Sequence, residues 1–473
     1  MCRVFEFLGA TVLTRTEIEH IHERSLDLLE RVGIGYQTPR ALEVLERHGC
    51  RVDYERNWAS LPREFVEWAV EQAPRVVRLE ARNPSQSVVL DGRRPHHTCD
   101  SQGTRAIDFE TGERLPSKEA SLRRGLLVAD ALDKLDVVNV MVAATDVPAH
   151  VRVVRHFQIA FELTGKPVRT GVLRADLVPF LVELARVATG EDEFRPIFST
   201  VHCSSSPLLH DGEMTEACME LARLRVPILL HPMPLAGATS PLPPAGTILQ
   251  HNVEVLSGLA LFQAVQPGAP LIYAAGPSQL DMVTGNYANN ANANAMRLAL
   301  VDVARFYNLP VNLGGLGTAS SSLDAHYGYE ASSACLLAYL AGVDEIYSMG
   351  LLDSSQTLSL DKLVLDNHLA RELEIMVQPI RIDEEQLSTD LIEQVGIGQH
   401  YLKRRETLAS LRNGYVRVWP PAGQNILDLV HGEAQQILES HRSFALPEGA
   451  LAKMHEVVRE ADHVLATARD KVA

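Results

Sequence analysis

The feature that most limits the possible fold is a unit of strand, loop and helix that repeats along the chain. Its clearest copy begins with the apolar run 226–230, which ends at His231-Pro232 and leads into a loop rich in glycine and proline. Helical apolar spacing follows from Ile248 to Leu256. A loop shaped only for packing would have the same composition, so the repetition carries the argument.

Eight apolar segments with strand character are each followed by a segment with helical spacing. The predicted strands are 98–107, 137–143, 167–172, 196–202, 226–230, 270–275, 310–313 and 345–348. The helices predicted to follow them are 117–132, 148–164, 175–188, 212–224, one through 248–256, 290–307, 324–341 and 359–375. Eight alternations predict an α/β fold, a (β/α)8 TIM barrel. An open doubly wound sheet is the alternative, but no Gly-x-Gly-x-x-Gly follows the early strands.

The barrel is predicted to occupy residues 96–380, between two other regions. Residues 1–95 are predicted to form a helical and β cap, with helices at 16–32, 39–48 and 62–73, strands at 76–79 and 87–90, and a hairpin turn at Asp91-Gly92. Residues 381–473 are predicted to form a helical extension that packs on the barrel and ends in a helix at 449–469.

Charge and cysteine content narrow the functional class. The 473 residues include 60 acidic and 44 basic side chains, and the net charge of -16 argues against nucleic acid and anionic membranes as partners. No apolar run approaches the roughly 20 residues of a membrane helix, and the N-terminus does not resemble a signal peptide. The six cysteines are scattered without a Cys-x-x-Cys pair. We therefore expect a reduced, cytoplasmic protein; a homo-oligomer is left open.

In TIM barrels the active site is built from the loops that follow the strands. His202 and His231 end adjacent predicted strands, so their rings could face one another. With Cys203 they could form a zinc site, although hydrogen-bonded histidines that shape a pocket are the favoured interpretation. No predicted strand ends in lysine, which argues against Schiff-base chemistry.

Two segments that open helices carry further candidates. In 324–330, Asp324 is a natural helix N-cap, and Glu330 lies about two turns inside the helix, where a buried carboxylate would need a partner. The segment 285–290 is rich in amides around Tyr287. Tyr287 and Tyr327 could offer ring faces to an alkylated ammonium group, although either ring could equally serve packing.

At these residues the chain resembles the trimethylamine methyltransferase family, specifically its members that lack pyrrolysine, which include glycine betaine methyltransferases. The likeness extends from about residue 28 to about residue 420. The matching stretches are Ser206-Pro207-Leu208, Pro232-Met233-Pro234 with 237–241, Ala245-Gly246 running to Glu254, 267–270, 324–330 and 350–353. Departures lie at Pro243-Pro244 and in 251–254.

The resemblance implies a TIM barrel that transfers a methyl group from a methylamine to the cobalt of a corrinoid carried by a separate small protein. Because this chain has only standard residues, the resemblance implies a quaternary amine such as glycine betaine, proline betaine or carnitine rather than trimethylamine. No tightly bound cofactor and no metal are expected. The alternatives are a non-catalytic sensor that binds betaines and a metal-assisted enzyme that uses His202, His231 and Cys203.

The resulting site hypothesis places tyrosine faces and one carboxylate around the ammonium group. The catalytic candidates are Glu330 and Asp353. The substrate-binding candidates are His202, His231, Thr239, Ser240, Tyr287, Asn289, Asp324, His326 and Tyr327.

Overall fold

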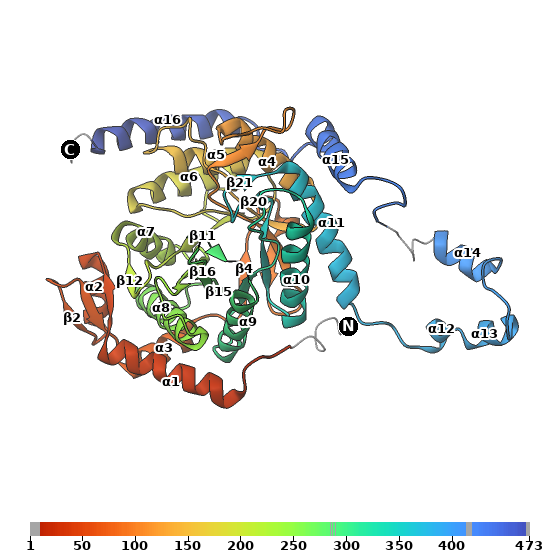
Figure 1. Cartoon of the computed structure of the whole chain (residues 1–473). Coiled ribbons are helices and arrows are strands. Elements are labelled where there is room, and N and C mark those ends of the chain that lie inside the picture. Colours follow the sequence, from red (N-terminus) through yellow and green to blue (C-terminus); the bar gives the residue numbers. More distant parts are fainter. Residues whose placement is uncertain (1–9, 284, 286, 289, 413–418, 470–473) are drawn as a thin grey trace.

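The core of the molecule is a closed barrel of eight parallel strands in the order β10-β11-β13-β15-β18-β19-β6-β9 (Figure 1). The computed structural model describes residues 10–283, 285, 287–288, 290–412 and 419–469. The barrel strands are β6 (His96–Cys99), β9 (Leu135–Asn139), β10 (Val168–Arg169), β11 (Phe198–His202), β13 (Ile228–Leu230), β15 (Leu271–Ala275), β18 (Val311–Gly314) and β19 (Glu345–Met349). The predicted TIM barrel is confirmed.

Helices surround the barrel, one after each strand (Figure 1). They are α4 (Glu119–Ala131), α5 (Arg152–Leu163), α6 (Val178–Thr189), α7 (Gly212–Arg223), α8 (Pro244–Val265), α9 (Ala291–Phe306), α10 (Ala325–Ala341) and α11 (Leu360–Val377). Each overlaps the helix expected at its place. Helix α8 is buried from Val253 to Ala264, since the N-terminal helices α1 (Arg15–Arg31), α2 (Pro39–Arg47) and α3 (Arg63–Gln72) cover its outer face.

The first predicted strand, 98–107, was wrong in its extent. Strand β6 ends at Cys99, and the chain then turns through Gln102, whose φ of 71° is incompatible with a continuing strand. Strand β7 (Arg105–Ile107) instead pairs antiparallel with β8 (Arg114–Pro116). These strands belong to a four-stranded sheet with β20 (Leu351–Leu352) and β21 (Thr357–Leu358) outside the barrel.

Two other small sheets have strands of only two or three residues. Strands β1 (Ile34–Tyr36), β2 (Arg51–Asp53), β3 (Trp58–Ser60) and β12 (Leu209–His210) form one of them. Strands β14 (Leu235–Ala236), β16 (Ser278–Leu280) and β17 (Tyr287–Ala288) form the other, from the loops after β13 and β15. Such strands are too short to show an alternating apolar pattern, which explains why the sequence did not predict them.

A hairpin packs against the barrel interior. Strand β4 (Val77–Leu79) pairs antiparallel with β5 (Val88–Leu90), and their apolar side chains cluster with Val137, Leu229 and Ile272 of the barrel wall. The hairpin turns through residues 80–87, which include a short 3-10 helix, so the turn predicted at Asp91-Gly92 was wrong. Asp91 and Gly92 instead connect β5 to β6, and the Gly92 amide donates at 2.8 Å to Asp344, the residue before β19.

A buried ion pair crosses the barrel interior. Arg169 on β10 donates to both carboxylate oxygens of Glu345 on β19, at 2.9 and 2.8 Å, and Asn312 donates to the same carboxylate at 3.0 Å. Strands β10 and β19 are not neighbours in the barrel, so this bond spans the lumen. Both side chains are at most 1% exposed, so removing either one would leave the other charge buried without a counter-charge.

A second buried ion pair holds α11 against the loops at the carboxyl end of the barrel. Lys362 lies 2.6 Å from Asp366 and donates to the carbonyl of Leu316 at 2.8 Å. Asp366 also accepts from the Tyr327 hydroxyl and from the Gly350 amide. Helix α11, helix α10 and the turn after β19 are therefore tied to one carboxylate.

Replacing Asp366 with alanine is expected to destabilise the fold by about 3–5 kcal/mol, because the Lys362 ammonium would remain buried without its counter-charge. The measurement is the denaturation midpoint in urea. Asp361→Ala on the same helix is the matched control, since Asp361 pairs with His431 at a partly exposed site, where the loss should stay under about 1 kcal/mol. Equal shifts for the two variants would contradict the expectation.

The C-terminal region returns to the barrel after an excursion. Helix α15 (Ile426–Ser440) packs against α4 and α11, and α16 (Ala450–Arg469) packs against α5 and α6. Between α11 and α15, the short helices α12 to α14 project away from the barrel (Figure 1). The proposed division into 1–95, 96–380 and 381–473 stays a prediction. In the described ranges, no helix has the length and apolar content required to cross a membrane.

Candidate active site

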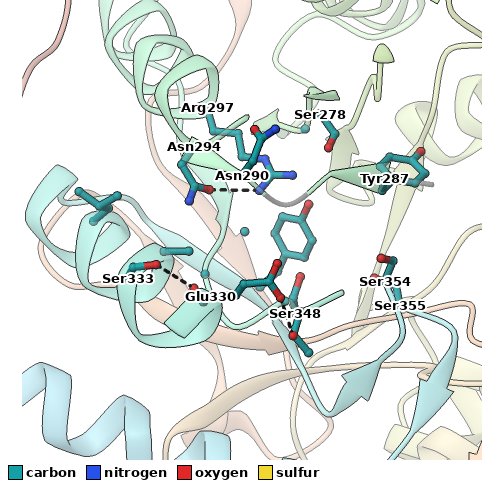
Figure 2. A pocket seen from close by; sticks show the side chains of 18 of the residues that line it. Ser278, Tyr287, Asn290, Asn294, Arg297, Glu330, Ser333, Ser348, Ser354 and Ser355 are labelled. Atoms are coloured by element: carbon teal, nitrogen blue, oxygen red, sulfur yellow. Dashed lines mark hydrogen bonds between the residues drawn. The ribbon is translucent and has the colours of Figure 1, made fainter. Parts of the chain in front are cut away.

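A cavity of about 480 Å3 opens at the carboxyl ends of the barrel strands. Its walls come from the loops after β13, β15, β18 and β19 and from helices α9 and α10. Figure 2 shows the side chains of Arg297, Tyr287 and Glu330 converging on it from different elements. Tyr287 and Tyr329 line the cavity and are 44% and 70% exposed, so the cavity is open to solvent.

Arg297 places a cation in the cavity wall. Its Nε donates to the carbonyl of Pro277 at 3.0 Å, and its Nη1 lies 3.4 Å from Oδ1 of Asn294. Burial lowers the pKa of Arg297, while Tyr347, Tyr287 and Glu330 act in the opposite direction. Because an arginine keeps its proton even after a substantial decrease, the cavity contains a fixed positive charge.

Glu330 places a carboxylate in the same cavity. Its Oε2 accepts from the Thr318 hydroxyl at 2.6 Å and from the Ala319 amide at 2.8 Å. Its Oε1 lies 3.2 Å from Nε2 of His326, whose side chain is 55% exposed. The loop after β18 therefore fixes one oxygen, and the other is directed toward the mouth with His326.

The predicted tyrosines differ in position. Tyr287 lines the cavity. Tyr327 is buried: its hydroxyl donates to Asp366 at 2.7 Å and its ring lies 5.3 Å from the Lys362 ammonium. Tyr347, which was not predicted, lines the cavity, and burial raises its pKa to about 12.

The two predicted histidines lie on opposite sides of the barrel wall. Val201 and Leu229 face the lumen, so His202, one residue after Val201, faces outward and contacts Thr215 and Phe262 of the surrounding helices. His231, two residues after Leu229, faces inward, with Nε2 3.4 Å from the Tyr347 hydroxyl. Burial lowers the pKa of each imidazole to about 4, so both are neutral near pH 7.

This geometry does not bring His202, His231 and Cys203 together as metal ligands. Burial raises the pKa of the Cys203 thiol to about 12. Over the described ranges, no group of three or more His, Cys, Asp or Glu side chains is arranged to hold a metal ion.

The remaining predicted residues lie in loops and caps around the cavity. Thr239 accepts from the Leu235 amide, and Ser240 bonds to Thr247, so both shape the turn before α8. Asp324 caps α10, and the Tyr327 amide and neighbouring serines lower its pKa. Asp353 pairs with Arg114 at 2.8 Å. Asn289 lies outside the described residues.

The end of β19 and the loop after it hold several non-glycine residues with positive φ. Ser348 has a φ of 90°, and Asp353, Ser354 and Ser355 have φ values of 56°, 53° and 70°. Ser348, Ser354 and Ser355 line the cavity, and Ser355 donates to the buried carboxylate of Asp100 at 2.6 Å. Such conformations cost of order 1 kcal/mol each and concentrate at functional sites, which supports this cavity as the site of chemistry.

Comparison with known proteins agrees with the fold and defines the family. The family described as trimethylamine methyltransferase (MTTB) matches residues 6–421. The chain is 30% identical to trimethylamine methyltransferase MttB of Desulfitobacterium hafniense, over 99% of this chain and 97% of the relative. It is 27% identical to a glycine betaine methyltransferase of the same species, over 95% and 96%.

A solved structure of similar shape is the monomethylamine methyltransferase MtmB of Methanosarcina barkeri. The match has a TM-score of 0.52 at 11% identity and covers 97% of this chain and 96% of that one. At this identity the likeness concerns the fold alone.

Proposed function

The chain belongs to the trimethylamine methyltransferase family and is a methyltransferase, and from that premise we propose that its methyl donor is a zwitterionic quaternary amine such as glycine betaine. The relatives' names include both trimethylamine and glycine betaine. The choice between trimethylamine and glycine betaine as the donor therefore rests on the charged side chains that line the cavity.

The observation that carries the proposal is the pair of opposite charges in one cavity, Arg297 and Glu330. A guanidinium binds a carboxylate through a fork of N–H donors, whereas it would repel a simple cation. A carboxylate attracts an ammonium group. A ligand that carries both charges satisfies both side chains, whereas protonated trimethylamine satisfies the carboxylate alone.

The aromatic residues of the cavity suit the alkylated end of such a ligand. Tyr287 and Tyr347 both line the cavity, and aromatic faces attract quaternary ammonium groups. His231 supports Tyr347 through the 3.4 Å contact between its Nε2 and the hydroxyl. We infer that His231 stands behind the aromatic wall rather than on the ligand.

The chemistry requires positioning more than proton transfer. A quaternary nitrogen already bears a positive charge, so its amine leaves without being protonated first. The work left to this chain is to fix both ends of the donor so that one methyl group points toward the mouth. A neutral His231, with its pKa near 4, is consistent with a site that needs no general acid.

A corrinoid held by a partner protein would supply the reduced cobalt that accepts the methyl group. The residues at the mouth fit a large, partly apolar surface. Met233, Leu242, Met282 and Val283, which we call the rim patch, are between 39% and 94% exposed. Met233 lines the cavity, and Leu242 and Met282 both flank Gly237 in the loop after β13. The rim patch would contact the macrocycle or its carrier.

The test is a panel of methyl donors offered to the purified protein with free reduced cobalamin as acceptor, followed by the absorbance of reduced cobalamin. We expect glycine betaine, proline betaine or carnitine to be consumed in preference to choline and trimethylamine. A preference for trimethylamine would overturn the proposal. Calorimetric binding of a betaine without any methyl transfer would instead identify a sensor.

A further inference from the structure

Residues 378–412, which we call the arm, leave the barrel at the end of α11 and carry α12 (Glu384–Leu387), α13 (Thr389–Val395) and α14 (Arg405–Arg412). Figure 1 shows these helices projecting from the molecule. The chain returns at Trp419, whose ring stacks on His368 of α11 at 4.1 Å. Both ends of the excursion are therefore attached to one helix. Long excursions from a compact domain are usually either functional or linker segments.

The arm exposes large apolar side chains. Val395 is its only buried residue. Its exposed apolar residues are Ile380, Ile382, Leu387, Ile392, Ile397, Tyr401, Leu402, Leu408 and Leu411, and Ile397 at the middle is fully exposed. Because these side chains lie in solvent, they contribute little to the fold of a single chain, and a run of exposed large apolar residues is typical of an interaction surface. The arm therefore requires a covering surface.

The charges of the arm indicate what that surface is. Its first part, 383–393, carries Asp383, Glu384, Glu385, Asp390 and Glu393, whereas its last part, 403–412, carries Lys403, Arg404, Arg405 and Arg412 with a single acid, Glu406. In a contact with two-fold symmetry, residue i of one copy contacts residue j of the other, and residue j of the first copy contacts residue i of the second. Two antiparallel arms would place each acidic part against a basic part.

We propose that the arm pairs with the arm of a second copy of this chain in a two-fold antiparallel contact. Ile397 lies midway between the acidic and basic parts, so the symmetry axis passes close to it. The apolar residues on either side are then covered by their counterparts. The pairing is separate from the cavity and does not depend on which methyl donor the protein uses.

The first test locates the axis. The variant Ile397→Cys, mildly oxidised, is expected to run as a covalent dimer on non-reducing gels, because each new thiol meets its own copy. Ser410→Cys is the matched control: its residue is also exposed but lies in the basic part, far from the axis. The unmodified protein is a second control, because it shows any cross-link that forms through the natural cysteines. Equal cross-linking of the two variants, or none of Ile397→Cys, would overturn the proposal.

The second test exchanges charges at exposed positions. One variant carries Glu384→Lys, Asp390→Lys and Glu393→Lys, and the other carries Lys403→Glu, Arg405→Glu and Arg412→Glu. In each variant alone, both parts of the arm have a net charge of the same sign, and the protein should sediment with half the mass of the unmodified protein at micromolar concentration. An equimolar mixture, or all six changes in one chain, should restore the larger mass. Loss of mass without rescue, or no loss at all, contradicts the antiparallel pairing, and circular dichroism checks folding.

Discussion

Replacing Arg297 with methionine is expected to raise KM for glycine betaine by about 100-fold, since removing one partner of a buried charge pair costs 2–5 kcal/mol or more. Methionine approximates the length of the arginine stem and keeps the apolar contacts of α9. The positive charge beside Tyr347 and Glu330 disappears. The measurement is the rate of cobalamin methylation against donor concentration.

The informative control is a donor that lacks the carboxylate. Choline keeps the quaternary ammonium group but has no carboxylate for Arg297 to bind, so its KM should stay unchanged or fall in the variant. Arg297→Lys should lie between, because a lysine keeps the charge and loses the two-pronged geometry. If Arg297→Met raises KM equally for choline and for betaine, the guanidinium supports the cavity wall and does not bind the carboxylate.

The barrel itself was predictable because its physical signals are long and repeated. Parallel strands buried on both faces give apolar runs such as 226–230, and the helices between them show a 3.6-residue period. The predicted helix 324–341 differs from α10 by one residue, because Asp324 is a sequence-visible N-cap and Gly342 adopts a left-handed conformation at the C-cap.

The site was only partly predictable, because a strand residue can face either side of the sheet. His202 and His231 both end strands, yet their rings point in opposite directions. The two cases can be told apart only once Val201 and Leu229 are known to face the barrel interior. The same alternation places Glu345 and Tyr347 of β19 on one face, so Tyr347 could have been found once Glu345 was assigned to the lumen.

Arg297 had no comparable signal. In the sequence it is one polar residue of a helix with mixed spacing, and its role appears only when the carbonyl of Pro277 and the side chain of Asn294 orient it. Glu330 was predictable from the improbability of an acid two turns inside an apolar helix. Its partners Thr318 and Ala319 come from the preceding loop, which no helical pattern describes.

Replacing Glu330 with glutamine is expected to lower kcat/KM for every quaternary donor by about 30-fold, or about 2 kcal/mol. A carboxylate and an ammonium about 5 Å apart attract by about 3 kcal/mol at the effective dielectric of a protein site, and desolvation reduces the net gain. Glutamine is isosteric, and its carbonyl oxygen can still accept from Thr318 and Ala319. The denaturation midpoint should therefore change little, which separates lost charge from lost structure.

The two substitutions together distinguish a zwitterion site from a cavity that only tolerates betaines. Loss of Glu330 should weaken betaine and choline alike, since both carry the ammonium, whereas loss of Arg297 should weaken betaine alone. The effect of Glu330→Gln should fall mainly on KM, because the nitrogen loses its charge as the methyl departs and the carboxylate favours the bound donor over the transition state. A decrease confined to kcat would mean that Glu330 acts on the departing amine, and an unchanged kcat/KM would remove Glu330 from the site.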